Sequence, residues 1–352
     1  PEMSRGLGDV YKRQAHICVY SFVNTILNPD CDEMARLWYM RPESFYFIWS
    51  RRNYMNIILL VLGFILLLKG ADWFVDGSSS IASRFGIPQL IIGLTIVAMG
   101  TSLPEAFVSI TAALKSNAAI TIGNVVGSNI LNVGIILGIT ALIRPLHIQN
   151  STIKYEMPFM MLVTLVLILQ GINNTISRFD GIILWLFFLG YLYYIFRMTK
   201  NQTEEAEIKK TNPLFIPLGL VCLMIGSNFA VDAATNIAIS LGVSQRFIGL
   251  TIVALGTSLP ELVTSVTAAK KGNADIAIGN IIGSNIFNIL FVVGSSALIT
   301  PVPFEPNFII DSFIAILIGL ILYICTKKTR VLDKKAGILL LITYLIYFIY
   351  LL

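Results

Sequence analysis

The sequence has little charge. Its 352 residues include 20 Asp and Glu and 25 Lys and Arg, together 13% of the chain, whereas a soluble domain usually has about 25%. So few charged side chains cannot cover the surface of a soluble protein of this size unless lipid covers most of it. The composition therefore excludes an ordinary soluble enzyme and predicts an integral membrane protein, in agreement with a mean hydropathy of +0.78.

Histidine and cysteine are also scarce. The chain has two His and four Cys, and they do not have the CxxC or Cys/His spacing of a metal site or a disulfide framework. We therefore expect no cofactor and no transition-metal centre. The formal net charge of +5 does not indicate a nucleic-acid partner, because the basic residues lie in short clusters between apolar segments, as in cytoplasmic loops of membrane proteins.

Long apolar runs occupy most of the chain from residue 53 onward. Runs such as NIILLVLGFILLL and PFMMLVTLVLILQ are continuously apolar, whereas the strands of a membrane barrel alternate. We therefore predict an all-α integral membrane protein with ten transmembrane helices. The expected segments are 56–76, 79–115, 118–143, 154–172, 178–198, 213–232, 235–270, 274–299, 308–326 and 336–352.

Residues 1–52 differ in composition from the rest. They carry 7 of the 25 Lys and Arg and 6 of the 20 Asp and Glu, and they include no apolar run of membrane length. They show no helical periodicity, and the apolar core of a signal peptide is missing. The opening PEMSRGLGDVYKRQ resembles translated adapter sequence. We expect a non-native, non-membrane leader and a natural start at Met55, with a disordered native tail as the alternative.

Loop charge predicts the orientation in the membrane. The charged loops are RMTKNQTEEAEIKK after the fifth segment, TKKTRVLDKK after the ninth and Lys270-Lys271 after the seventh, whereas TPVPFEPN after the eighth has neither Lys nor Arg. The positive-inside rule places the charged loops in the cytoplasm. We therefore expect a multi-pass protein of the cytoplasmic membrane, with residues 199–212 as a cytoplasmic loop and both ends of the membrane domain outside.

The two halves of the membrane domain are copies of one another. Residues 93–132 align without a gap to residues 249–288 at a constant offset of 156, and 28 of the 40 positions are identical. Each half holds five segments, in residues 53–198 and 213–352. Because five is odd, the second copy enters the membrane from the opposite side. This predicts an inverted-topology repeat with a site near the midplane, where the copies meet.

The hexapeptide GTSLPE interrupts an apolar segment in each copy. Pro104 and Pro260 each remove a backbone donor and clash with the preceding turn, so we predict two broken helices. Non-helical backbone at membrane depth is tolerated where it is buried in protein or lines a wet cavity, and its carbonyls can then coordinate cations. Candidate ligands are the two carbonyls about one turn before the breaks, those of Ala98 and Ala254.

Glu105 and Glu261 lie inside apolar segments, where an ionised carboxylate costs about 2.5 to 3.5 kcal/mol on insertion scales. Brought together, they would repel each other unless a proton or a cation neutralises them. Hard oxygen ligands suit Ca²⁺ or Na⁺. Nearby hydroxyls and amides complete the candidate metal site: Thr101, Ser102, Ser128, Asn132, Thr257, Ser258, Ser284 and Asn288. For the Ser and Asn side chains, hydrogen bonding between helices is an open alternative.

The duplicated GTSLPE and GSNxxN motifs resemble the alpha-1 and alpha-2 repeats of the sodium/calcium exchanger family, within the cation/calcium antiporter superfamily, and especially its compact prokaryotic members. The similarity covers residues 55–352. It implies a secondary antiporter rather than an enzyme. The antiporter would extrude Ca²⁺ as several Na⁺ enter. Glu105 and Glu261 match the ion-binding glutamates of the family, and the other candidate side chains and the carbonyls of Ala98 and Ala254 match the surrounding ligands.

Residue 288 departs from part of the family, because it is Asn where some prokaryotic members and the potassium-dependent exchangers have Asp. With Asn132 and Asn288 neutral, the site holds two formal negative charges, which Ca²⁺ or two Na⁺ balance. A third Na⁺ would leave a net positive complex, so we expect electrogenic, K⁺-independent exchange. The first and sixth segments are duplicated but lack GTSLPE, and they are the candidate gating elements of an alternating-access cycle.

Three other functions fit parts of the sequence. A Ca²⁺/H⁺ antiporter would use the same glutamates, since a buried carboxylate can carry a proton in place of Na⁺. A passive cation channel would lack counterflow. An intramembrane serine hydrolase based on Ser102 or Ser258 lacks a positioned base, because His147 lies in an expected loop. The expected partners are Na⁺ and Ca²⁺ as substrates and the lipid bilayer, with no nucleic acid and no obligate protein partner.

Overall fold

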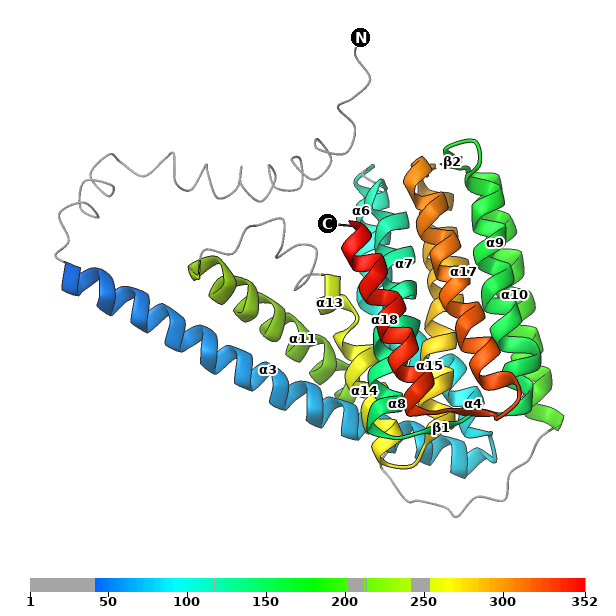
Figure 1. Ribbon diagram of the computed structural model, residues 1–352, viewed down its shortest axis with the longest axis horizontal. Coiled ribbons are helices and arrows are strands. Elements are labelled where there is room, and N and C mark those ends of the chain that lie inside the picture. The colour runs from blue at the N-terminus through cyan, green and yellow to red at the C-terminus, as the bar shows by residue number, and fades with distance from the viewer. Residues whose placement is uncertain (1–41, 117, 202–211, 213, 242–253, 352) are drawn as a thin grey trace, which may run out of the picture. The chain divides into compact units, whose positions relative to one another are not determined.

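The computed structural model describes residues 42–116, 118–201, 212, 214–241 and 254–351, with side chains from Tyr54 onward except those of residues 200, 201 and 254. The chain divides into two compact units, residues 1–55 and 56–352. All the candidate site residues belong to the second unit. Its described part consists of helices, short loops and four two-residue strands (Figure 1).

Helices follow one another along both halves of the chain. In the first half they are α3 (Pro42–Phe85), α4 (Gln89–Ile92), η1 (Gly93–Val97), α5 (Ala98–Thr101), α6 (Leu103–Leu114), α7 (Ile120–Leu131), η2 (Asn132–Leu137), α8 (Gly138–Ile143), η3 (Thr152–Glu156), α9 (Met157–Gly171) and α10 (Arg178–Asn201). In the second half they are α11 (Phe215–Ser240), α13 (Ala254–Thr257), α14 (Leu259–Lys270), α15 (Ala274–Phe287), η5 (Asn288–Val293), α16 (Gly294–Ile299), α17 (Pro306–Lys327) and α18 (Lys334–Leu351). The η segments are π-helical turns within longer helices.

Eight helical stretches in the described residues are long and apolar enough to cross a membrane, and nine if the bent pair 89–101 and 103–114 forms one span. A multi-helix membrane architecture is therefore confirmed. The expected total of ten is not reached, because residues 242–253 of the seventh expected segment lie outside the described residues. The same holds for residues 1–41 of the expected leader and for most of the expected loop 199–212.

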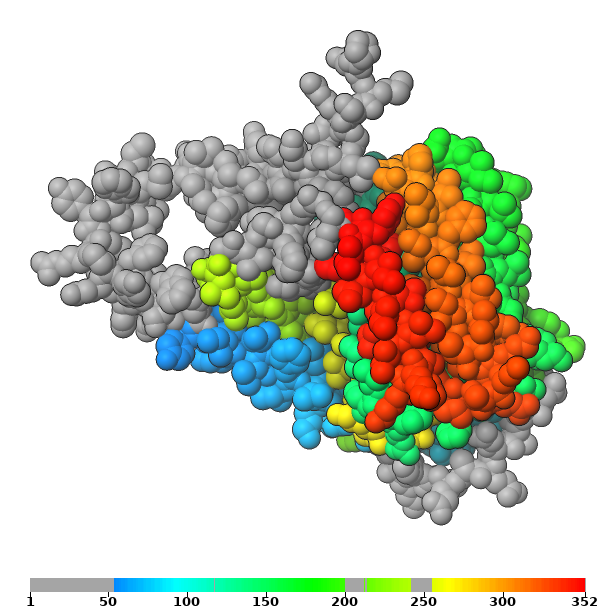
Figure 2. Space-filling model, viewed as in Figure 1, coloured from blue at the N-terminus to red at the C-terminus, as the bar shows by residue number. Residues whose placement is uncertain are grey.

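The helices differ greatly in burial. In the stretch from Ala274 to Ile299, 94% of the most apolar 18-residue window is buried, against 22% in each of α17 and α18. Figure 2 shows α17 and α18 on the face toward the viewer. Apolar side chains of these two helices, such as Leu317 and Ile346, are exposed. Exposed apolar faces of this extent are expected where lipid covers the helices. The continuous helix α15–η5–α16 is thus the centre of the unit.

The second expected segment begins later than predicted. We expected it at residue 79, but α3 continues past that point. Gly86 then adopts a left-handed conformation with φ of +62°, and the backbone N–H of Ile87 donates to the carbonyl of Ala82 at 2.8 Å. This is a common way to cap a helix with glycine, and Pro88 occupies the N-cap of the next helix. The break between α3 and α4 therefore lies at residues 86–88.

Two other boundaries also differ from the expectation. Helix α3 begins at Pro42, so residues 42–52 of the expected leader are helical although their sequence shows no helical periodicity. Helix α11 continues to Ser240, beyond the predicted end of the sixth segment at 232. Its extension is the counterpart of the extension of α3 at the offset of 156. The duplicated helices therefore end at corresponding places.

Two small antiparallel sheets join the halves of the chain. Strand β1 (Leu146–His147) pairs with β4 (Val331–Leu332), and β2 (Thr175–Ile176) pairs with β3 (Val302–Pro303). The offset of 156 relates β1 to β3 and β2 to β4. Figure 1 places β1 and β2 at opposite ends of the helices. Equivalent loops of the two halves thus lie at opposite ends.

Glycines let two pairs of helices approach closely. A β-carbon at Gly283 of α15 would lie 2.7 Å from the carbonyl oxygen of Leu94 and from the β-carbon of Ala98. Helices α3 and α11 approach in the same way: a β-carbon at Gly70 would lie 2.8 Å from the carbonyl oxygen of Gly219. Side chains larger than hydrogen would separate these backbones. The first contact brings Ala98 to the middle of α15.

Candidate cation-binding site

Both GTSLPE motifs break a helix at the serine, as the sequence predicts. Ser102 separates α5 from α6 with φ and ψ of −84° and 8°, and the two helices of that span are bent by 49°. Ser258 separates α13 from α14 with φ and ψ of −90° and 6°. Each glutamate then lies in the first turn of the following helix. The positive end of that helix dipole favours a carboxylate there.

The glutamates are buried and contacted from the opposite half of the chain. Glu105 is 1% exposed and Glu261 is 0% exposed. The Ser102 hydroxyl donates to Glu261 Oε1 at 3.1 Å, and the Ser258 hydroxyl donates to Glu105 Oε1 at 3.4 Å. Ser128 also donates to Glu105 Oε1, at 3.5 Å. The serine of each broken helix therefore holds the carboxylate of the other.

Four buried side-chain oxygens of the site have no hydrogen-bond donor among the described residues. Two are the second carboxylate oxygens of the glutamates, and two are amide oxygens: Glu105 Oε2, Glu261 Oε2, Asn132 Oδ1 and Asn288 Oδ1. Buried oxygens of this kind are normally paired, so their occurrence at corresponding positions of both halves needs a reason. Carboxylate and amide oxygens are the ligands that Ca²⁺ prefers.

The remaining predicted residues lie around this cluster. The Ala98 carbonyl accepts from the Ser284 hydroxyl at 3.2 Å and from Thr101 at 3.4 Å. Thr257 is the last residue of α13, directly before Ser258. Ala254 is the first residue of α13, and its side chain is outside the described part. The structure thus brings these predicted side chains together around the glutamates. The contacts of Ala254 lie outside its described part.

Two asparagines that the sequence analysis did not select support the broken helices. Asn124 Nδ2 donates to the backbone carbonyl of Glu105 at 3.2 Å and to Ser109 Oγ at 2.9 Å. Asn280 makes the same pair of bonds to Glu261, at 3.4 Å, and to Ser265, at 2.9 Å. Their signal in the sequence is duplication, since Asn124 and Asn280 are the first asparagines of the two GNxxGSNxxN runs.

A third buried carboxylate lies in the fourth expected segment. Glu156 is 1% exposed, and the Tyr194 hydroxyl donates to its Oε1. The sequence does not single it out, because Lys154 and Tyr155 beside it suggest a segment end. It has no acidic counterpart in the second half, where Ser312 occupies the equivalent position. Among the described residues, no three His, Cys, Asp or Glu side chains lie close enough together to hold a metal ion.

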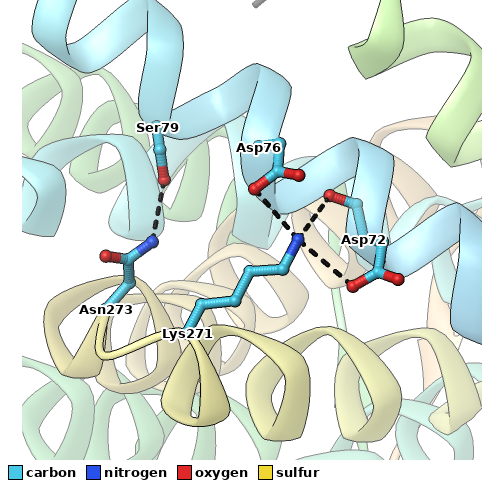
Figure 3. Close-up of polar contacts among 5 residues, drawn as sticks. All are labelled: Asp72, Asp76, Ser79, Lys271 and Asn273. Atoms are coloured by element: carbon cyan, nitrogen blue, oxygen red, sulfur yellow. Dashed lines mark hydrogen bonds and ion pairs between the residues drawn. The ribbon is translucent and has the colours of Figure 1, made fainter. Parts of the chain in front are cut away.

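An ionic contact joins α3 to the loop after α14 (Figure 3). Lys271 Nζ lies 2.9 Å from Asp76 Oδ1 and 3.1 Å from Asp72 Oδ1, and it also donates to the Asp72 carbonyl at 3.1 Å. Asn273 Nδ2 donates to Ser79 Oγ at 3.0 Å. We call the group of Lys271, Asp72 and Asp76 the lysine clamp. It connects a candidate gating helix with the helix that carries Glu261.

Among the described residues, the clamp has no counterpart in the other half. At the offset of 156, Lys271 corresponds to Lys115 and Asp76 corresponds to Asp232. Within the part of the chain that the structure describes, Lys115 and Asp232 form no ion pair with each other. The Lys271 ion pairs to α3 are therefore not repeated between the equivalent residues Lys115 and Asp232.

The serine hydrolase alternative finds no support in this geometry. The Ser102 and Ser258 hydroxyls donate to Glu261 and Glu105, so His147, the base considered for a nucleophilic serine, is not their partner in these contacts. His147 is exposed in β1, where it is opposite Val331. The arrangement of oxygen ligands instead suits reversible binding of a hard cation.

Comparisons with known proteins identify the family of this chain. The family model described as "Sodium/calcium exchanger protein" matches residues 55–197 and 211–352. Inner membrane protein YrbG of Escherichia coli (strain K12) is 37% identical over 301 residues, which cover 80% of this chain and 92% of that protein. Sodium/calcium exchanger MaX1 of Methanosarcina acetivorans is 31% identical over 342 residues, 84% of this chain and 98% of the relative.

Solved structures lead to the same family. The structure of the sodium-calcium exchanger NCX_Mj soaked with zero Na⁺ and Ca²⁺ has a TM-score of 0.75 and 34% sequence identity, over 85% of this chain and 99% of that one. The match therefore extends over the whole neighbour. The chain belongs to the sodium/calcium exchanger protein family, a family of membrane antiporters for Ca²⁺ and a second cation rather than of enzymes.

Proposed function

We propose that this protein exchanges Na⁺ for Ca²⁺ across the cytoplasmic membrane by alternating access, with both ions binding in turn between Glu105 and Glu261. The observation that carries the proposal is the set of four buried oxygens without a donor, two from each half. A cation bound among them would satisfy these oxygens, whereas a buried carboxylate without a cation or a proton is costly. The ions are the substrates, and no organic cofactor is needed.

Charge balance supports competition between Na⁺ and Ca²⁺ for one site. Both glutamates are buried, and Asn132 and Asn288 add oxygens without charge. Ca²⁺ or two Na⁺ neutralise such a site, so the two ions compete for the same carboxylates. A third Na⁺ makes the loaded site positive. The exchange is therefore electrogenic, and it does not need K⁺, because the site has no third carboxylate.

The ten proposed helices form inverted repeats, and the sheet pairing supports the inversion. An offset of 156 exchanges β1 with β3 and β2 with β4, yet β1 pairs with β4 and β2 with β3. A two-fold axis that inverts one half relative to the other accounts for this crossed pairing. The expected domains, 53–198 and 213–352 around the loop 199–212, follow the same division.

Loop charge supports the expected orientation. Arg144 beside β1 donates to the carbonyl of Lys270 at 3.2 Å, and basic residues such as Lys328 and Arg330 precede β4. One end of the unit thus collects Lys and Arg, and the positive-inside rule assigns that end to the cytoplasm. Both ends of the membrane domain then lie outside.

Helices α3 and α11 are the proposed gating elements. They contact each other through Gly63 and Gly226 and through Gly70 and Gly219, so they can move together against the rest of the unit. The lysine clamp holds α3 to the cytoplasmic end, which suits a state whose site is closed on that side. Release of the clamp and formation of its counterpart on the other side would accompany the opposite state.

The test is ⁴⁵Ca²⁺ uptake into proteoliposomes loaded with Na⁺. We expect uptake that depends on the outward Na⁺ gradient, does not need K⁺ and is faster with an inside-positive potential, because three Na⁺ leaving for one Ca²⁺ entering export one positive charge. Uptake driven by a pH gradient without Na⁺ would instead indicate Ca²⁺/H⁺ exchange. Uptake without any counter-gradient would indicate a channel.

A further inference from the structure

We propose that Asn129 and Asn285 are positioning residues, which turn the amide oxygens of Asn132 and Asn288 toward the transported cation. The inference rests on the proposed function, since it concerns the same site. The four asparagines lie in α7–η2 and α15–η5, and none is more than 4% exposed. In an apolar surrounding, the orientation of such amides depends on the partners that the protein supplies.

Two of the side chains are fixed by backbone carbonyls. Asn129 Nδ2 donates to the carbonyl of Asn285 at 3.0 Å, and Asn285 Nδ2 donates to the carbonyl of Asn129 at 3.1 Å. A carbonyl can only accept a hydrogen bond, so each side chain must present its amino group to it. The amide oxygens of Asn129 and Asn285 therefore face away from these carbonyls.

These fixed oxygens in turn orient the two candidate ligands. Asn132 Nδ2 donates to Asn285 Oδ1 at 3.0 Å, and Asn288 Nδ2 donates to Asn129 Oδ1 at 3.1 Å. A flipped Asn288 would lose this bond and place its oxygen against another acceptor. The amino groups of Asn132 and Asn288 are thus fixed, and this fixes the direction of the two amide oxygens as well. Within the described residues those two oxygens accept no hydrogen bond.

The backbone supports the same division of roles. The π-helical turns η2 and η5 begin at Asn132 and Asn288, whereas Asn129 and Asn285 lie on regular α-helical turns. Single π-helical turns within α-helices are frequent at functional sites. The ligand asparagines are therefore on irregular backbone, and the positioning asparagines lie on regular backbone one turn earlier. An offset of 156 relates Asn129 to Asn285 and Asn132 to Asn288.

The substitution Asn129→Leu tests the proposal. Leucine has a similar size but neither accepts nor donates, so the amide of Asn288 becomes free to turn. We expect about tenfold weaker apparent affinity for Na⁺ and for Ca²⁺, the usual effect of one lost buried hydrogen-bond partner. The affinities are measured from the ion dependence of transport and from the rise in melting temperature that each ion causes.

The matched background is Asn288→Asp. A carboxylate presents an oxygen to the site in either orientation, so in this background Asn129→Leu should weaken ion affinity by no more than about twofold. Each comparison is made within one background, and the added charge therefore cancels. Equal losses in both backgrounds would overturn the proposal, because Asn129 would then support the fold rather than the orientation of an amide.

Two further arms cover the remaining outcomes. If Asn129→Leu does not fold, Asn129→Ser replaces it, since its hydroxyl can still accept from Asn288; we then expect about threefold weaker affinity, again only in the Asn288 background. Absence of Na⁺-driven Ca²⁺ uptake in the unsubstituted protein would reject the proposed exchange, while the ion-induced rise in melting temperature would still test the amide orientation. No such rise in the unsubstituted protein would reject both.

Discussion

Gly283 shows how little room there is between α15 and the first broken helix. A β-carbon at this position would lie 2.7 Å from the Leu94 carbonyl oxygen and 2.7 Å from the β-carbon of Ala98. Because backbone atoms must move to make room, we expect Gly283→Ala to lower the free energy of unfolding by about 1 to 3 kcal/mol. The control is Gly190→Ala, where nothing lies within 4 Å.

The readout for Gly283→Ala is the melting temperature in detergent, with and without Ca²⁺. A fall in melting temperature for Gly283→Ala, with no fall for Gly190→Ala, agrees with close packing. Two equal melting temperatures would mean that the contact between α15 and η1 is looser than the distances indicate. Because alanine has the higher helix propensity, Gly190→Ala can even be slightly stabilising.

Single residues also mark the limit of what sequence can predict. Glu105 and Glu261 stand out because they lie inside apolar segments, and the duplicated motif adds the serines and Asn132 and Asn288. Asn129 has the same chemistry and the same duplication as Asn132, so its different role was not predictable. That role depends on a carbonyl of α15, in the other half of the chain, and a contact across the repeat interface leaves no local pattern.

Among the elements, α3 carries a contact that can be broken from outside the site. Removing the charge of Lys271 releases both Asp72 and Asp76. These side chains are half-exposed, so the clamp contributes only about 0.2 to 1 kcal/mol. We expect Lys271→Met to weaken the apparent Na⁺ affinity on the extracellular side about threefold, because the state that is closed toward the cytoplasm becomes less populated.

The matched control for the clamp is Lys270→Met, which removes the neighbouring charge and leaves Lys271 in place. Apparent Na⁺ affinities are measured separately on each side of oriented proteoliposomes. If Lys271→Met and Lys270→Met behave alike on both sides, the clamp does not select a state. A weaker extracellular affinity for Lys271→Met alone, with a stronger cytoplasmic affinity, supports its role in gating.

The existence of the elements was more predictable than their ends. Apolar length suffices to find the spans, and Pro104 and Pro260 locate the breaks at Ser102 and Ser258. The end of α3 at Phe85 was not predicted, although Gly86 followed by Pro88 is a usual stop signal. A long apolar run continues on both sides of that stop, and periodicity alone does not show where one helix ends and the next begins.

In the whole molecule, the site exists only where the two halves meet. Ser102 of the first half bonds Glu261 of the second, and Ser258 of the second bonds Glu105 of the first. Neither half alone would provide both carboxylates or satisfy their hydroxyl partners. The offset of 156 predicts that the halves are related, but the crossed bonds follow from folding. This is why we expect both glutamates to be needed for one ion to bind.

The most direct measurement of this central claim is Na⁺-driven ⁴⁵Ca²⁺ uptake by Glu105→Gln and Glu261→Gln, compared with the parent and with Glu305→Gln at the N-cap of α17. Each glutamine keeps the shape of the side chain but removes one of the two charges that we propose bind Ca²⁺. We predict that either substitution reduces uptake at least about tenfold, while Glu305→Gln transports like the parent. Uptake at the parent rate by either Glu105→Gln or Glu261→Gln would contradict the shared two-carboxylate site.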